Sequence, residues 1–351
     1  MSPRRSILKA LGLCALTLLT ACGPAAAPAA TTGSEGATTL RVGYFPNLTH
    51  SQALIGLARG DFRESLGTDV SIEATSFNAG PAVIEALFAG AIDLAYIGPN
   101  PAINGYVKSR GEALRVVAGA TSGGAAFVVR PEAGITGPAD LAGKKLATPQ
   151  LGGTQDVALR NYIVTHGLKT VENGGEVEIV PTDNSQTLDL FRQGMIDGAW
   201  VPEPWASRLV VEGGGTIFID ERDLWPNGDF VTTHIIVSTA FLEAHPDIIR
   251  NWLRAHVAIT LWELEHPDEA KAAVNAEIER ITGKKLPDAV LEQAWMRLRV
   301  TWDPIAPSLT TAAESAFTAG FLNEKPDLTG IYDLTLLNEV LVEAGQPALA
   351  P

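Results

Sequence analysis

The sequence predicts an α/β fold of two lobes followed by a helical C-terminal tail. The main observation is a repeat, because residues 88–101 (FAGAIDLAYIGPNP) and residues 191–204 (FRQGMIDGAWVPEP) share one order of features. In each, a helix-like run ends at Gly, Ile-Asp opens an apolar strand with an aromatic residue, and prolines mark a new helix. Strands and helices alternate around both copies, which is typical of parallel sheets covered by helices. A chain of 351 residues is long enough for two such lobes.

Both copies place a proline where a strand gives way to a helix. Pro99 and Pro204 are tolerated there because N–H groups in the first turn of a helix have no intrahelical partner, so a proline loses no hydrogen bond. The other N–H groups of that turn point out of the strand end, where they can hold a ligand without a charged side chain. We therefore expect main-chain donors to contribute to binding.

The N-terminus has the pattern of a secretory signal. Basic residues at positions 4, 5 and 9 accompany an apolar run over residues 8–19, which is too short to span a bilayer. The sequence Leu-Thr-Ala-Cys at 19–22 resembles the bacterial lipobox. This resemblance implies that residues 1–21 are a lipoprotein signal peptide and that Cys22 is acylated; a plain signal peptide with an incidental cysteine is the alternative. Residues 22–39 are rich in Ala, Pro, Gly and Thr, which predicts a flexible, lipid-anchored linker.

Charge and residue usage exclude several kinds of function. Loss of residues 1–21 removes three basic residues, which leaves 23 basic against 40 acidic residues and a formal charge of −17. So acidic a protein is not expected to bind nucleic acid. Cys14 leaves with the signal, so the mature chain has no thiol for a disulfide, a nucleophile or a thiolate metal site. The six histidines form no metal-binding motif and no G-x-S-x-G elbow is present, so we expect no metal, no cofactor and no enzyme activity.

The first lobe is expected to begin with residues 40–130. Its predicted elements alternate along the chain: strand 40–45, helix 52–59, strand 69–77, helix 80–88, strand 93–97, helix 99–109, and strands 114–119 and 125–130. Pro131 and a Gly/Pro-rich break follow, and there we expect the chain to cross into a second lobe.

The second lobe is expected over residues 131–229 and repeats the alternation. Its predicted elements are strand 145–148, helix 157–166, strand 176–180, helix 185–193, strand 197–201, helix 204–211 and strand 216–219. Residues 230–351 are expected to return to the first lobe and to end in helices. The return begins with a predicted strand at 230–238, and apolar residues recur at helical spacing over 248–264 and 290–300. Two crossings between the lobes imply a hinge.

Polar side chains gather where the predicted strands end, which is where open parallel sheets bind their ligands. The candidates after the first, third and fourth strands are Asn47, Thr49, His50, Pro99, Asn100, Thr121 and Ser122. His50 taken alone fits an exposed helix cap as well as a ligand contact.

Two further stretches carry candidate contacts. Gly152 and Gly153 lie between a strand and a helix and allow close approach of the backbone to an anion, while Thr154 adds a hydroxyl; the same pattern also forms plain tight turns. Trp205 suits either a cleft wall beside an apolar ligand tail or packing between lobes. Glu203 can cap its own helix or accept an ammonium, and would repel an anion.

Several motifs together resemble the substrate-binding lipoproteins of ABC importers for aliphatic sulfonates, nitrate and taurine. They are VGYFPNLTH at 42–50, AGAIDLAYIGP at 89–99, DLAGKK at 140–145, TP at 148–149 and EPW at 203–205, within a match over about 40–264. The resemblance implies a two-lobed periplasmic-binding-protein fold of type II that closes over one small molecule. It places the cleft-lining loops at 47–51, 98–100, 121–124, 150–155, 203–205 and 232–234, and so adds Gln155 and Thr233 to the candidates.

The chemistry of these loops narrows the ligand. They contain neither Arg nor Lys, which favours a sulfonate-like monoanion held by N–H and O–H donors over a phosphate dianion. Nitrate, taurine and an uncharged pyrimidine or thiamine-precursor heterocycle remain alternatives, and an enzyme with His50 or His234 as general base is a further one. The resemblance implies an ABC permease and its ATPase as partners of a lipid-anchored monomer, in the periplasm or on the outer cell face.

Overall fold

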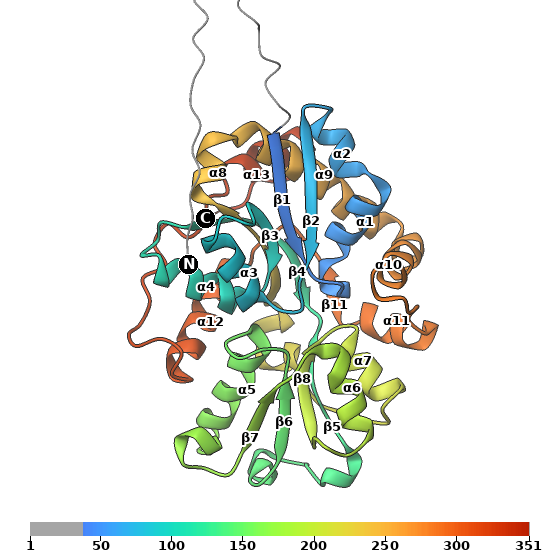
Figure 1. Ribbon diagram of the computed structural model, residues 1–351, viewed down its shortest axis with the longest axis vertical. Helices are drawn as coiled ribbons and strands as arrows, with labels where there is room; N and C mark the ends of the chain where they lie inside the picture. The colour runs from blue at the N-terminus through green and yellow to red at the C-terminus, as the bar shows by residue number, and fades with distance from the viewer. Residues whose placement is uncertain (1–37, 351) are drawn as a thin grey trace, which may run out of the picture. The chain divides into compact units, whose positions relative to one another are not determined.

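The computed structural model describes residues 38–350 and contains two sheets with helices on their faces (Figure 1). The predicted α/β architecture with a helical C-terminal region is confirmed. The signal peptide, Cys22 and most of the predicted linker lie outside the described residues, as does Pro351.

The first sheet has six strands in the order β11-β4-β10-β3-β1-β2. Their bounds are β1 Thr38–Tyr44, β2 Val70–Ser76, β3 Leu94–Ile97, β4 Leu114–Gly123, β10 Val231–Ser238 and β11 Leu298–Val300. The strands β1, β2 and β3 are parallel, whereas β10 runs antiparallel to β3 and β4. Side chains of β3 alternate between two apolar cores, with Tyr96 in one and Ile97 in the other, because both faces of the sheet are covered.

Helices cover this first sheet on both faces. Their bounds are α1 Ser51–Arg59, α2 Asp61–Leu66, α3 Gly80–Phe88, α4 Pro99–Lys108, α8 Thr239–Ala244, α9 Pro246–Glu265, α10 Pro267–Thr282, α11 Asp288–Trp295, α12 Ala306–Thr318 and α13 Thr335–Glu343. One core packs the sheet against α1, α2, α9, α10, α11 and α13, and the other packs it against α3, α4 and α12.

The second sheet has five strands in the order β7-β6-β8-β5-β9. The bounds in this lobe are β5 Ala125–Val129, β6 Lys145–Thr148, α5 Thr154–Thr165, β7 Glu178–Pro181, α6 Asn184–Arg192, β8 Gly198–Pro202, α7 Trp205–Val211 and β9 Thr216–Asp220. Strands β6, β7 and β8 are parallel, and the two faces of the sheet again carry separate cores.

The first crossing between the sheets lies earlier than expected. The predicted boundary followed Arg130, but β5 pairs with β8 and β9 and belongs to the second sheet. The chain turns at Gly123 and Gly124, whose φ angles of 72° and 78° suit glycine. The strand β10 carries the chain back into the first sheet.

Two other boundaries differ from expectation. Thr38 and Thr39, placed in the linker, belong to β1 and pair with Val70 and Ser71. The helical spacing over 290–300 continues past the end of α11, where β11 adds an edge strand beside β4. Pairing with an available sheet edge overrides local helical preference in this short segment.

Candidate ligand site between the lobes

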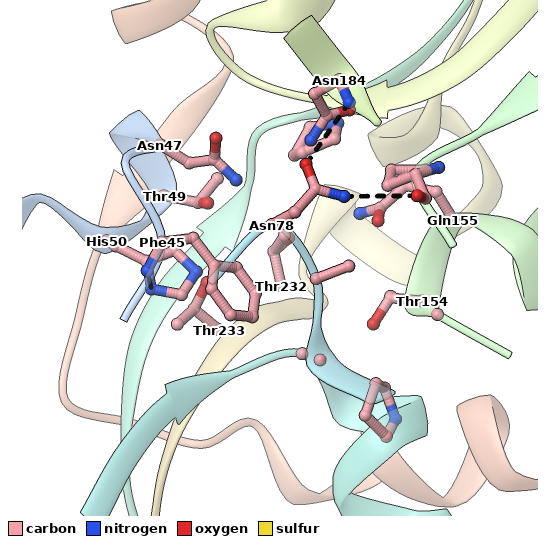
Figure 2. Close-up of a pocket in the computed structure, with 17 residues that line it drawn as sticks. Phe45, Asn47, Thr49, His50, Asn78, Thr154, Gln155, Asn184, Thr232 and Thr233 are labelled. Carbon is pink, nitrogen blue, oxygen red and sulfur yellow. Dashed lines mark hydrogen bonds between the residues drawn. The ribbon is translucent and has the colours of Figure 1, made fainter. Parts of the chain in front are cut away.

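A small polar cavity lies where the two lobes meet, and we call it the inner cavity (Figure 2). Its volume of about 30 Å³ admits a group of a few heavy atoms, since one water needs about 10–15 Å³. The residues that line it are Phe45, Asn47, Thr49, His50, Asn78, Ala79, Gly80, Gly98, Pro101, Thr232 and Thr233 from the first lobe and Pro149, Gly153, Thr154, Gln155, Asn184 and Pro202 from the second. No Asp, Glu, Lys or Arg is among them.

The inner cavity collects the carboxyl ends of parallel strands from both sheets. The helices that follow these strands begin at its wall: Ala79 and Gly98 are the N-caps of α3 and α4, Gly153 is the N-cap of α5, and Asn184 opens α6. First-turn N–H groups of a helix have no intrahelical partner, and the helix dipole adds partial positive charge there. The site therefore favours negative charge without containing a cationic side chain.

His50 contributes a neutral side chain. Its Nδ1 accepts a hydrogen bond from the Phe45 N–H at 3.3 Å, which leaves the proton on Nε2. Complete burial lowers the pKa of His50 to about 3, so the ring is uncharged at neutral pH. His50 is therefore a hydrogen-bond donor and not an exposed cap, and a base of this pKa would be protonated only in strong acid.

Two buried polar groups in the lining have no hydrogen-bond partner within residues 38–350. They are the Thr233 hydroxyl, on β10, and the Asn184 side-chain oxygen. An unpaired buried polar group costs about 1–3 kcal/mol, and such groups recur where a ligand completes the bonding. The amide of Asn184 can present either its oxygen or its nitrogen by rotation.

The Asn78 side chain of the first lobe reaches main-chain groups of the second lobe at the inner cavity. The Asn78 amide donates to the Pro149 carbonyl at 3.3 Å and its oxygen accepts from the Asn184 N–H at 3.4 Å. Figure 2 shows Asn78 reaching toward Asn184. A Cβ on Gly98 would lie 2.1 Å from the Thr154 hydroxyl oxygen, so only glycine permits this approach.

Trp205 contacts the other lobe and also lines a pocket. Its indole Nε1 donates to the side-chain oxygen of Asn47 at 3.0 Å and so joins the lobes. Its ring also lines a second, larger pocket beside the inner cavity.

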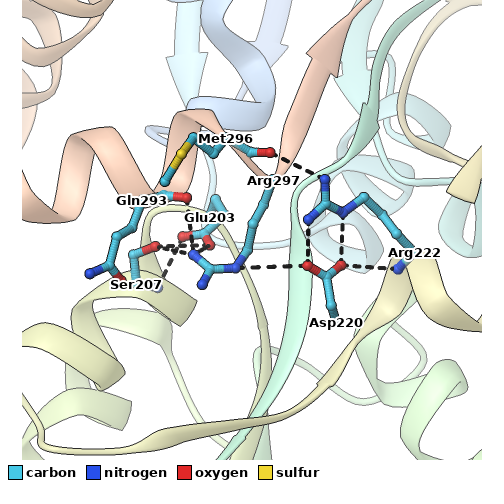
Figure 3. Close-up of polar contacts among 7 residues, drawn as sticks. All are labelled: Glu203, Ser207, Asp220, Arg222, Gln293, Met296 and Arg297. Atoms are coloured by element: carbon cyan, nitrogen blue, oxygen red, sulfur yellow. Dashed lines mark hydrogen bonds and ion pairs between the residues drawn. The ribbon is translucent and has the colours of Figure 1, made fainter.

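Glu203 does not line the inner cavity. Its carboxylate is buried and accepts from the N–H and hydroxyl of Ser207, both at 3.0 Å, which caps the first turn of α7 (Figure 3). Arg297 lies 3.4 Å away and donates to the Ser207 hydroxyl. Burial raises the pKa of Glu203, and Arg297 and Ser207 counter this effect. The charge that would repel an anion is thus turned away from the inner cavity.

Five other predicted contacts lie outside the lining of the inner cavity. Asn100 donates to the Ala312 carbonyl on α12, and the Thr121 hydroxyl donates to the Thr49 carbonyl. Pro99 starts α4, Ser122 lies within β4, and the Gly152 N–H donates to Asp156. The Asn100 side chain is thus held against α12, whereas Gly98 lies against Thr154 of the other lobe. The hypothetical base His234 also lies elsewhere, with its Nε2 3.2 Å from the Pro304 carbonyl.

Asn47, Thr49, His50, Gly153, Thr154, Gln155 and Thr233 are brought together in the lining, and Asn78 and Asn184 are additions that the sequence reading missed. Asn78 lies between β2 and α3, and Asn184, which follows β7, is the first residue of α6. The rule that located Asn47 applies equally to these positions.

A metal-binding cluster and a membrane-spanning helix are both absent from residues 38–350. That part of the chain holds no group of three or more His, Cys, Asp or Glu side chains placed to bind a metal. None of its helices combines the length and apolarity that crossing a membrane requires.

Comparison with known proteins agrees with this architecture. A Bacillus subtilis (strain 168) protein named for binding aliphatic sulfonates is 25% identical over 309 residues, which are 87% of this chain and 88% of the relative. The alkanesulfonate-binding protein SsuA from Xanthomonas axonopodis pv. citri, solved with MOPS bound, superimposes with a TM-score of 0.69 at 18% identity over 84% of this chain and 98% of that one. The nitrate-binding protein NrtA from Synechocystis PCC 6803 superimposes with a TM-score of 0.73 at 14% identity, over 87% of this chain and 89% of that one. These solved structures show the shared two-lobed fold. The profile of the NMT1-like family matches residues 33–278, most of the chain, and the protein therefore belongs to the NMT1-like family.

Proposed function

We propose that this protein is the solute-binding component of an ABC importer and that it captures a small organic anion, an aliphatic sulfonate, between its lobes. The observation that carries the proposal is an inner cavity to which both lobes contribute hydrogen-bonding side chains, none of them charged. The relative named for aliphatic sulfonates and the alkanesulfonate-binding structure support the same ligand class.

The donor set suits a sulfonate group. A sulfonate carries one negative charge, three acceptor oxygens and no proton to donate. The His50 Nε2–H, the Thr233 hydroxyl and the first turn of α5 supply donors from both lobes. A phosphate dianion is disfavoured because no Arg or Lys lines the cavity and the mature chain is strongly acidic.

Delivery requires partners outside this chain. We infer export followed by acylation at Cys22, so that a monomer tethered by residues 22–39 presents its ligand to a permease coupled to an ATPase. The lipobox-like sequence at 19–22 supports the anchor. Metabolic labelling with a radioactive fatty acid tests it: label is expected on the native chain and is expected to be lost in Cys22→Ala.

A thermal-shift panel tests the ligand class. Methanesulfonate, ethanesulfonate, taurine, nitrate, bicarbonate, phosphate and a pyrimidine are compared on the mature chain without its lipid. At a ligand concentration of about 100 times Kd, the folded state gains roughly 2.7 kcal/mol. Stabilisation by sulfonates and none by phosphate is expected. A shift with the pyrimidine alone, or with nitrate alone, would replace the sulfonate by that ligand.

A further inference from the structure

The turn between β6 and α5, residues 149–153, brings main-chain groups of the second lobe to the inner cavity. The Gly153 N–H donates to the Gln150 carbonyl at 3.0 Å, and Gly152 has φ at 74°, which glycine adopts readily. Gly153 lines the inner cavity and is the N-cap of α5. The conformation of this turn therefore decides where the first-turn N–H groups of α5 point.

One buried carboxylate, that of Asp156, holds the turn. Its Oδ2 accepts from the Gly152 N–H at 2.9 Å, and its Oδ1 accepts from the Thr148 hydroxyl at 2.8 Å. Asp156 is fully buried and does not line the inner cavity. It therefore ties the end of β6, the turn and the start of α5 into one unit from outside the ligand site.

Arg160 supplies the counter-charge for Asp156. Its Nε donates to Asp156 Oδ2 at 3.1 Å, and only 9% of its side chain is exposed. An unpaired carboxylate at this position would repel an anion bound at the first turn of α5, and the pairing with Arg160 offsets that repulsion. The pair thus fixes the turn through a strong acceptor and adds no net charge.

The first lobe contacts the same unit. Phe321 follows α12, and its ring centroid lies 5.8 Å from the Arg160 Cζ. A Cβ on Gly152 would lie 3.7 Å from the same ring. Val157, the residue after Asp156, belongs to a core of the first lobe that includes α12. These contacts cross between the lobes, so the C-terminal region takes part in supporting the turn.

We propose that Asp156 and Arg160 are positioning residues of the ligand site, which fix the turn so that the first-turn N–H groups of α5 meet the anion. Phe321 completes this support from the first lobe when the lobes are together. The inference rests on the proposed function and deepens it, because it assigns the direction of the donors to a buried ion pair that lines no part of the inner cavity.

Asp156→Asn separates positioning from simple electrostatics. The amide has one acceptor oxygen in place of two and no negative charge. The loss of charge alone would tighten the binding of an anion, because Asp156 would no longer neutralise the cationic Arg160. We expect the opposite, since the donors of α5 lose their fixed direction. Calorimetry on the mature chain should show a Kd for methanesulfonate about tenfold higher or more, as for the loss of one hydrogen bond to a charged group.

Hydrogen exchange of the Gly152 amide, followed by NMR on the unliganded mature chain, reports on the turn itself. Exchange in Asp156→Asn should be at least about tenfold faster, while the amides of β8 keep their protection. This readout does not depend on the identity of the ligand.

Asp93→Asn is the matched control. Asp93 is also buried, and its Oδ2 accepts from the N–H of Arg41 at 2.9 Å and from its Nε at 2.8 Å. Neither residue lines the inner cavity. Asp93→Asn should lower the melting temperature and leave the Kd and the Gly152 exchange unchanged. An equal loss of affinity in both variants would assign the effect to general destabilisation and overturn the positioning role.

Phe321→Ala tests the support from the first lobe and alters neither member of the ion pair. The Kd for methanesulfonate should be about threefold higher, the size expected for the loss of one cation–π contact. Phe317→Ala is its control, because Phe317 is exposed near the end of α12, and it should bind as the native chain does. Native affinity in Phe321→Ala would overturn the contribution of the first lobe.

The outcomes separate this inference from the proposed function. Unchanged or tighter binding of methanesulfonate in Asp156→Asn would overturn the positioning role and leave the proposed function standing. Failure of the native chain to bind any sulfonate would overturn the proposed ligand class. In that case, native exchange of the Gly152 amide in Asp156→Asn would overturn the positioning role as well, and faster exchange would support it.

Discussion

At the scale of single residues, we expect the buried Thr233 hydroxyl to form a hydrogen bond with the ligand. Thr233→Val keeps the shape and removes the hydroxyl that has no partner within residues 38–350. We expect the unliganded protein to melt at the same temperature or slightly higher, because a buried unpaired group is lost. The affinity for methanesulfonate should fall about tenfold or more, since a hydrogen bond to a charged group contributes about 1.5–3 kcal/mol.

The control for Thr233 is a buried threonine outside the lining. The Thr260 hydroxyl donates to the His256 carbonyl at 2.8 Å, so Thr260→Val is expected to lower stability and to keep the affinity. Unchanged calorimetric binding in Thr233→Val would show that its hydroxyl does not contact the ligand.

The raised pKa of the buried Glu263 carboxyl should make the stability of the fold depend on pH. Its carboxyl is buried in the first lobe and, among residues 38–350, accepts only from the Ser51 hydroxyl at 2.7 Å. Burial raises its pKa to about 8, so the folded state holds a proton that the unfolded state releases near its ordinary value of 4.5. The stability contributed by the protonated form is therefore complete below about pH 4.5 and is lost as the pH rises toward 8.

Glu263→Gln removes this titration. The variant should gain stability over the native chain progressively between pH 4.5 and 8, by about 1.4 kcal/mol for each pH unit, and then stay constant. Melting curves from pH 4 to 9 measure the difference. The exposed Glu265, on the same helix, provides the control Glu265→Gln, which should follow the native curve. A constant difference at all pH values would contradict the assignment.

At the scale of elements, the link between α11 and α7 joins the lobes. Arg297 follows α11 and approaches Glu203 at the start of α7, where only 18% of the arginine side chain and none of the glutamate is exposed. Arg297→Met would leave a buried carboxylate without its counter-charge, and a loss of about 3 kcal/mol is expected. Adding Glu203→Gln should restore part of that loss.

Chemical denaturation of the two single variants and the double variant measures this coupling. Arg299→Met is the comparison, because Arg299 pairs with Asp229 at an exposed site, where a pair contributes about 0–1 kcal/mol. Equal losses in Arg297→Met and Arg299→Met, with no recovery in the double variant, would show that the link between α11 and α7 contributes little.

The elements also show how far the sequence could predict the structure. Periodicity and turn residues located the alternating strands and helices, since each depends on its own local pattern. Which sheet a strand joins is a tertiary property, and this explains why β5 was assigned to the first lobe. The segment of β11 reads as helix because only the neighbouring edge of β4 makes it a strand.

The sequence predicted the region of the site better than the individual side chains that line it. Strand ends indicated the correct region, and Asn47 and Thr154 both reach the inner cavity. Local sequence does not reveal which way a side chain points where a strand ends and a helix begins. Asn100 therefore faces α12, and Glu203 faces Arg297, although each is next to a residue that lines one of the two pockets.

At the scale of the whole molecule, binding depends on how closely the lobes approach. At the inner cavity, Gly98 of the first lobe lies against Thr154 of the second, and the Thr232 carbonyl lies 3.5 Å from the position of a Cβ on Gly98. A branched side chain at position 98 would therefore occupy the space between the lobes. Its backbone conformation is extended, with φ at −71°, so a valine fits each lobe taken separately.

Gly98→Val is thus expected to fold with nearly native stability and to hold the lobes apart. Methanesulfonate should bind at least about tenfold more weakly, because donors of one lobe no longer reach a ligand bound by the other. X-ray scattering at saturating ligand should give a larger radius of gyration for Gly98→Val than for the native chain. Gly137→Val is the control, since a Cβ there meets nothing nearer than 4.0 Å. Native affinity and dimensions in Gly98→Val would mean that ligand capture does not require the lobes to meet at this point, and that one lobe alone supplies the binding energy.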